Sequence, residues 1–600
     1  MKIFSLVLGA FSLVAVAWSD GAGNRLAHLT SDDPFYPGLG QARLTTPQWI
    51  GEEGVETVVV ISIDDLKETK KYEDYLRPVL ERLKRIENGR APATIFCNQL
   101  TPSDPQFQTW LKEGVSLDVH TLTHPCPLLG KAGDFAAAEQ TVHGGIDLLA
   151  KVPGNRPVAY RMPCCDSMNS LSPRFFAEIF ARPTGEGRFL SIDSSVMCLL
   201  TSKDASVPRE LVLDADGNER FRKYFPMELV PPRKLTFERF AGYIADYPYP
   251  YVIGRGCWEL PCVVPSDWEA FNTHGSKNPR TTEDWKAALD AIVVKQGVMT
   301  MVLHPHGWSD PQQIVDLIDH AEKKHGRKVR FLNMREVLER LEKHALAGNS
   351  LRSEDGGDNG VRLLDVNADG YMDVVIGNEK TSVTRVWDPK GTQWTEDKTP
   401  AAMTLQAKAG GRSDMHVQLG VLRTDGAATM LVKGHMTGAW TFYRGAWKET
   451  PELLNGLEEI STGKGGVDGG VRLRDFDGDG ICELLVSNPK QNAVYRWSAS
   501  NGRWESAGYA LPPGVTLVDE LGRDNGLRFV DLNADGFDDV FFSNAQRYDI
   551  HLWAKTTRPD LGWTPGWSHG VKFGERKGSP NEPPPIVRDG PHRNNGAWFK

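Results

Sequence analysis

The stretch Thr57-Val58-Val59-Val60-Ile61-Ser62-Ile63-Asp64-Asp65 joins a run of β-branched residues to a pair of carboxylates. Such a run predicts a buried strand, and the two aspartates stand where that strand ends. Similar apolar runs alternate with stretches of helical spacing as far as about residue 345, at 93–96, 115–119, 158–160, 189–192, 298–303 and 329–332. Strands that alternate with helices predict a parallel α/β sheet or barrel, in which active sites form at the carboxyl ends of the strands.

Two histidine motifs also follow apolar runs, His120-Thr-Leu-Thr-His124 and His304-Pro-His306. Together with Asp65, His120 and His124 provide an Asp-His-His ligand set for zinc or another divalent transition metal. Pro125 follows directly, so the motif is expected on a turn rather than on a metalloprotease helix. The sequence therefore predicts a metal site for assisted hydrolysis.

Three further residues have the chemistry that such a site needs. Asp64, next to a ligand, is the candidate general base. Arg161 is placed to pair with a carboxylate and shift its pKa. His304 is the candidate acid for the leaving group, and His306 is either its rival or a supporting partner of the site.

These motifs resemble, in order and spacing, those of the NodB-homology polysaccharide deacetylases, carbohydrate esterase family 4. The matching stretches are Ser62–Leu66, His120–His124, Arg161–Cys164 and Leu303-His304. The resemblance implies a distorted (β/α) barrel over roughly residues 50–345. It also implies Asp64 as base, Asp65, His120 and His124 as metal ligands, and His304 as acid, acting on an N-acetylated glycan.

Two residues depart from the family pattern, Leu66 in place of glycine and Cys164 in place of an aromatic residue. A backbone N–H can still stabilise an oxyanion after the second change. Two alternatives stay open: an O-acetyl glycan esterase, and a catalytically inactive glycan-binding or adhesion protein.

The second half of the chain is repetitive. Asp-Gly steps recur every 54 to 56 residues, which predicts strand-rich units such as propeller blades. Three copies carry a D-x-[DN]-x-D-G-x-x-[DE] loop, and the copy around Asp425-Gly426 has lost its acidic positions. The candidate calcium ligands are Asp365, Asn367, Asp369 and Asp373; Asp475, Asp477, Asp479 and Glu483; and Asp531, Asn533, Asp535 and Asp539.

These loops resemble the FG-GAP or VCBS repeats of integrin-type propellers, which implies calcium binding and a recognition role. The overall expectation is a distorted (β/α) barrel followed by an all-β propeller-like repeat domain. The expected divisions are 1–17 as a signal peptide, 18–347 as the deacetylase-like barrel and 348–600 as the repeats, with a linker from Gly348.

Charge and targeting features complete the expectation. Lys2, the apolar run to Val14 and Ala15-Val-Ala17 predict a signal peptide, and hence a secreted or periplasmic protein without a transmembrane segment. The formal net charge of −9 disfavours nucleic acid as a partner. The expected partners are an acetylated glycan and, through the propeller, a cell surface or matrix. Eight cysteines leave the disulfide pairing open, although Cys257 and Cys262 are spaced to close a small loop.

Overall fold

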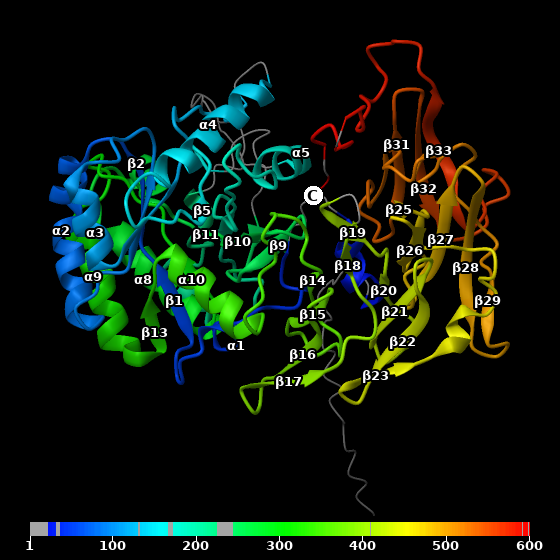
Figure 1. The fold of residues 1–600 in the computed structure, drawn as a ribbon, viewed down its shortest axis with the longest axis horizontal. Helices are drawn as coiled ribbons and strands as arrows, with labels where there is room; N and C mark the ends of the chain where they lie inside the picture. The colour runs from blue at the N-terminus through cyan, green and yellow to red at the C-terminus, as the bar shows by residue number, and fades with distance from the viewer. Residues whose placement is uncertain are drawn as a thin grey trace, which may run out of the picture.

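The chain folds into an α/β part and an all-β part that lie side by side in the computed structural model (Figure 1). The structure describes residues 22–31, 37–129, 133–165, 172–224, 244–407, 410–590, 592–597 and 599. The predicted signal peptide lies outside these residues. Among the helices described, none combines the length and the apolar character that crossing a membrane requires.

Two mostly parallel sheets form the α/β part, and β1 of one sheet continues into β2 of the other. A parallel bridge from Ile63 to Leu303 joins the two sheets at that point. The first sheet has the order β13 (Val329–Phe331), β1 (Thr57–Val60), β12 (Val298–Thr300), β11 (Cys262–Val263), β7 (Met197–Leu199) and β8 (Ile244–Ala245). The second has the order β2 (Ser62–Leu66), β3 (Ala93–Cys97), β4 (Val115–Val119), β5 (Ala159–Tyr160), β6 (Ile192–Asp193), β10 (Cys257–Glu259) and β9 (Tyr251–Ile253).

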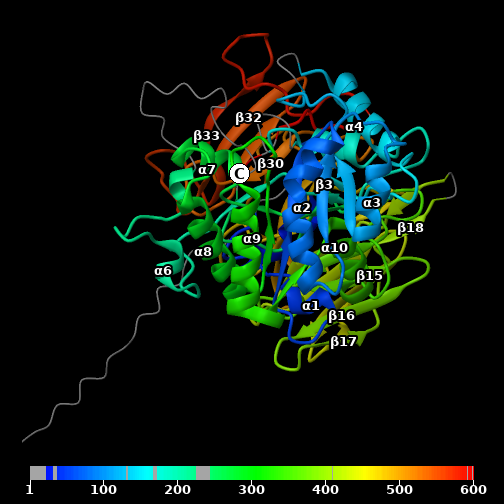
Figure 2. The same cartoon turned by 90° about the vertical axis from the view of Figure 1, so that its left-hand side faces the viewer.

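Helices cover the outside of these sheets (Figure 2). Polar side chains cap the starts of several helices. A backbone N–H of the first turn is accepted by each of Asp104, Asp134, Ser266, Asn278 and Asp310. The longer helices are α2 (Thr69–Ile86), α3 (Pro105–Glu113), α4 (Phe135–Leu149), α7 (Asp267–His274), α8 (Pro279–Lys295), α9 (Pro311–His320) and α10 (Met334–Arg340). The predicted alternation of strands and helices is thus confirmed over the described residues.

Besides two short two-stranded sheets, the described residues of the all-β part form four antiparallel four-stranded sheets, one for each predicted unit, including the copy that keeps only Asp425 of its acidic positions. Their strands are β14 (Val361–Leu364), β15 (Asp373–Gly377), β16 (Ser382–Asp388) and β17 (Gln393–Asp397); β20 (Gln418–Val421), β21 (Ala428–Lys433), β22 (Thr437–Tyr443) and β23 (Ala446–Glu449); β26 (Val471–Arg474), β27 (Glu483–Asn488), β28 (Gln491–Ser498) and β29 (Arg503–Ser506); and β30 (Leu527–Val530), β31 (Asp539–Ser543), β32 (Arg547–Ala554) and β33 (Gly566–Glu575).

A cavity of about 830 Å³ is lined by the first strand of each four-stranded sheet of the all-β part and by the hairpin between β9 and β10 of the α/β part. The segment expected to be a linker after Gly348 is packed rather than free. Arg352 in that segment is buried, and its guanidinium donates to the carbonyls of Leu190 and Phe180 in the α/β part. Buried hydrogen bonds therefore join the two parts of the chain.

Candidate active site

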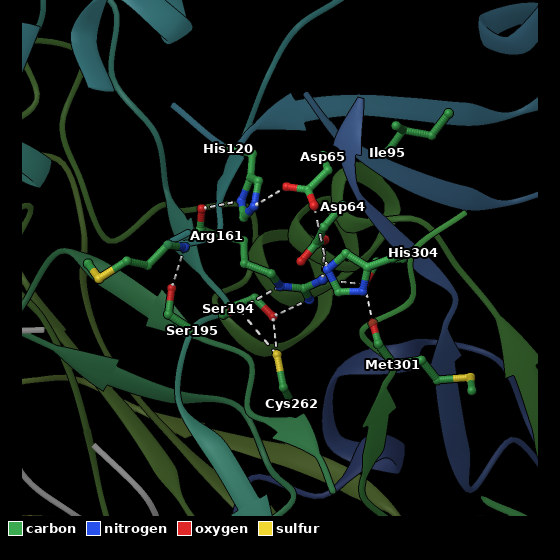
Figure 3. Close-up of polar contacts among 12 residues, drawn as sticks. Asp64, Asp65, Ile95, His120, Arg161, Ser194, Ser195, Cys262, Met301 and His304 are labelled. Carbon is green, nitrogen blue, oxygen red and sulfur yellow. Dashed lines mark hydrogen bonds and ion pairs between the residues drawn. The ribbon is translucent and has the colours of Figure 1, made fainter. Parts of the chain in front are cut away.

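Asp65, His120 and His124 converge at the carboxyl ends of β2 and β4. Figure 3 shows the side chains of Asp65 and His120 turned toward each other. Nε2 of His124 lies 2.9 Å from Oδ1 of Asp65, and Nε2 of His120 lies 3.4 Å from the same oxygen. Oδ1 is buried yet has no hydrogen-bond partner among the described residues. Three lone-pair donors around one point fit a divalent transition metal.

The loop that carries the two histidines is held by hydrogen bonds. Asn98 donates to the carbonyl of His120, and the hydroxyl of Thr141 accepts the N–H groups of Leu122 and Thr123. Nδ1–H of His120 donates to the carbonyl of Arg161 at 2.8 Å, which leaves Nε2 for a metal. The supporting contacts therefore fix the tautomer of His120.

Asp64 points away from the two histidines and pairs with Arg161. Nη1 of Arg161 lies 2.9 Å from Oδ1 of Asp64, and both side chains are buried. The guanidinium also donates to Ser62 and to the carbonyl and hydroxyl of Ser194, and it lies over the ring of Phe96. The first carboxylate of the pair is thus oriented by Arg161, while the second faces the histidines.

His304 and His306 make different contacts. Nδ1 of His304 is 2.8 Å from Oδ1 of the fully buried Asp267 at the start of α7. Burial lowers the pKa of His304, but the carboxylates of Asp267, Asp64 and Asp65 together outweigh burial and raise it to about 9. Nε2 of His306 instead lies 3.1 Å from Oδ2 of Asp65.

A disulfide between Cys126 and Cys164 joins the histidine loop to the loop after Arg161. His124, Cys164 and Asp65 all have positive φ, a conformation that is uncommon for residues other than glycine and frequent at functional sites. Cys257 and Cys262, whose spacing suggested a small disulfide loop, are separate buried thiols.

Several residues of this site carry no signal in the sequence. Asp267 looks like an ordinary residue in the first turn of a helix. Ser195 accepts the N–H of Met162 and donates to Asp193, so it holds the start of the loop that follows Arg161. Trp308 lies with its ring centroid 4.8 Å from that of His304, and its place in the sequence did not mark it as part of the site.

The three acidic loops of the all-β part differ in how their carboxylates are used. In the loop before β27, Asp475, Asp477 and Glu483 bring three ligand atoms within 4.8 Å. In the other two loops the last carboxylates, Asp373 and Asp539, each accept two backbone N–H groups, one for each oxygen.

Burial and repulsion destabilise the ionised form of these carboxylates. Burial, and then the charges of Asp477 and Asp475, raise the pKa of Glu483 to about 7, although Arg496 nearby lowers it. The pKa of Asp475 is raised for the same reasons. A bound cation would relieve this repulsion, and oxygen ligands of this kind suit calcium.

Removing calcium is therefore expected to lower the melting temperature of the all-β part. A site saturated at 100 times its Kd contributes about 2.7 kcal/mol to the free energy of unfolding. Differential scanning calorimetry with and without a calcium-selective chelator, with zinc kept constant, measures the change. An Asp475→Asn/Glu483→Gln variant should show a smaller response, and an identical thermogram with chelator would contradict calcium binding.

Comparison with known proteins gives one family match and several structural matches. Residues 475–542 match the FG-GAP-like repeat. No curated protein matches the chain. Among solved structures, the peptidoglycan deacetylase PdaC from Bacillus subtilis is 13% identical with a TM-score of 0.24, over 49% of this chain and 95% of that one.

Two other solved structures show the range of these matches. A family 4 carbohydrate esterase from Streptomyces lividans, in complex with acetate, is 13% identical with a TM-score of 0.24, over 45% of this chain and 90% of that one. Puue allantoinase is 13% identical with a TM-score of 0.32, over 52% and 97%. Scores this low establish neither a shared fold nor a shared activity. On its motifs, the first half of the chain resembles the NodB-homology polysaccharide deacetylases, and residues 475–542 match the FG-GAP-like repeat.

Proposed function

We propose that the chain is an exported, metal-dependent deacetylase that removes acetyl groups from an N-acetylated glycan. The supporting observation is that two neighbouring carboxylates have different partners. Asp65 faces two histidines, while Asp64, one residue earlier, is held by Arg161. Three metal ligands, an oriented carboxylate base and a His-Asp pair are the groups that metal-assisted hydrolysis needs.

A divalent ion held by Asp65, His120 and His124 would supply Lewis acidity, which polarises an acetyl carbonyl and acidifies a water molecule. Asp64 would take a proton from the attacking water, whose oxygen bonds to the carbonyl carbon. The backbone N–H at Cys164 is the proposed oxyanion donor. When the carbon–nitrogen bond breaks, His304 donates its Nε2 proton to the departing amine, so that acetate and an amino sugar are released.

The proposed domains are 18–347 for catalysis and 348–600 for recognition. The four-stranded sheets of the second domain line one cavity, which supports a propeller-like arrangement. Its acidic loops are the proposed calcium sites. A cell-surface or matrix glycan is the proposed partner. Trp308, beside His304 and stacked on Phe271, is the proposed aromatic contact for a sugar ring.

The rate is expected to fall at alkaline pH, as His304 loses the proton that it donates. Its pKa of about 9 places this decline near pH 9. Asp267→Asn removes the main charge that raises the pKa, so the decline should move to lower pH. A profile of kcat/KM against pH for both proteins measures the shift, and superimposable alkaline limbs would contradict the assignment of His304 as acid.

Acetate release from a panel of N-acetylated and O-acetylated glycans tests the proposal. The calcium-loaded chain is stripped of transition metal and then assayed with and without added zinc. Release that depends on zinc is expected, with N-acetylated members as substrates. His124→Ala should abolish it, whereas His435→Ala, at an exposed histidine of the all-β part, should not.

The remaining outcomes separate the alternatives. Release from O-acetylated members alone would identify an esterase. Equal release with and without zinc would contradict metal dependence. No release from any member, with zinc bound, would favour a glycan-binding protein without catalytic activity.

A further inference from the structure

A second cluster of metal-ligating side chains lies on the outer helices of the barrel. Asp290 belongs to α8, His320 is the last residue of α9, and His325 ends the π-helical turn η4 (Ala321–His325). Nε2 of His320 is 2.8 Å and Nε2 of His325 is 2.6 Å from the same oxygen, Oδ1 of Asp290. The composition is the same as that of the Asp65 cluster.

A change of helix type brings the two histidines together. Residues five apart lie on different faces of an α-helix, where neighbours are three or four residues apart. In η4, however, the N–H of Gly326 donates to the carbonyl of Ala321 five residues earlier. This turn brings the ring of His325 next to that of His320, with the two ring centroids 6.0 Å apart. Such π turns within α-helices are frequent at functional sites.

The two oxygens of Asp290 have separate partners, as they do in Asp65. Oδ1 accepts hydrogen bonds from Nε2 of His320 and Nε2 of His325, which a metal would replace, and Oδ2 accepts from Nζ of Lys324 at 2.8 Å. In the Asp65 cluster, Oδ2 is held by His306 in the same way. A ligating carboxylate is commonly held by a hydrogen bond of this kind, which directs its other oxygen to the metal.

We propose that Oδ1 of Asp290, Nε2 of His320 and Nε2 of His325 bind a divalent transition metal of the zinc class. Zinc–nitrogen bonds of about 2.0–2.1 Å put neighbouring ligand atoms about 3.3 Å apart, so the rings of His320 and His325 need withdraw by only about 0.5 Å and about 0.7 Å from Asp290. The side chains of His320 and His325 are 22% and 11% exposed, which leaves room for a water as fourth ligand.

The position in the fold indicates a structural ion. His325 lies shortly before β13, at the amino ends of the parallel strands, whereas Asp65, His120 and His124 lie at the carboxyl ends. In folds of this kind, residues at the amino ends of the parallel strands usually contribute to stability, whereas catalytic residues lie at the carboxyl ends. The ion would tie the middle of α8 to the end of α9 (Figure 2).

Zinc stoichiometry of the calcium-saturated full-length chain tests the site. The proteins are the wild type, His320→Ala/His325→Ala, His124→Ala and the exposed control His435→Ala. After equilibration with zinc and gel filtration, bound zinc is measured by mass spectrometry of the metal. The double variant should lose about one zinc ion per chain relative to the wild type and to His435→Ala, and His124→Ala should retain that ion.

An unchanged zinc content in the double variant would overturn the proposal. The result is independent of the proposed catalytic metal, since loss of that ion is read from His124→Ala alone. If the double variant does not fold, cobalt substitution of His124→Ala leaves the Asp290 site intact. Visible absorption of a four-coordinate cobalt ion is then expected, and its absence would equally overturn the proposal.

Discussion

Asp64→Asn is expected to lower the rate of acetate release by a factor of about 10² to 10⁴, the usual contribution of a positioned general base. An asparagine amide has nearly the shape of the carboxylate but cannot take a proton from water. Its oxygen can still accept from Nη1 of Arg161, so the fold around the site should remain. Initial rates on the best glycan of the panel measure the loss.

The zinc content of Asp64→Asn should equal that of the wild type, because Asp64 faces Arg161 and not the histidines. Asp74→Asn is a matched control, since Asp74 is an exposed carboxylate on α2 paired with Lys70. Full activity in Asp64→Asn would exclude it as the base. Loss of zinc together with activity would instead make Asp64 part of the metal site.

The residues that the sequence places in the site share one property. Asp64, Asp65, His120 and His304 each follow a run of buried residues, so a strand and its carboxyl end are visible in the pattern. A parallel arrangement then brings those ends together. The same reasoning predicts the four repeat units, because the Asp-Gly turn between their strands recurs at a constant spacing.

Among the partners of these residues, Arg161 was predicted to pair with a carboxylate, but the others could not be predicted, because nothing local marks them. Asp267 reaches His304 only because α7 begins beside the loop after β12. The disulfide joins Cys126 to Cys164 because two loops with left-handed residues meet there, and eight cysteines allow many other pairings. The segment after Gly348 has the composition of a linker, yet Arg352 within it finds backbone carbonyls of the barrel.

Arg161→Met is expected to lower the free energy of unfolding of the barrel by about 3–5 kcal/mol, the usual cost of removing one partner from a buried ion pair. Arg161 is fully buried, and Asp64 is nearly so. Methionine replaces the apolar stem but leaves the Asp64 carboxylate and the Ser194 hydroxyl without their guanidinium donor. Urea denaturation, followed through the transition of the barrel, measures the loss.

The double variant Asp64→Asn/Arg161→Met distinguishes a charge effect from a packing effect. If the cost arises from a buried unpaired carboxylate, removing that charge should restore part of the stability, and the double variant should be more stable than Arg161→Met alone. If the cost arises from lost packing against Phe96, the two losses should add. Additive losses would mean that Arg161 mainly supports the loop of Met162 and Cys164. A recovery would show that the base depends on Arg161 to remain a carboxylate in a buried position.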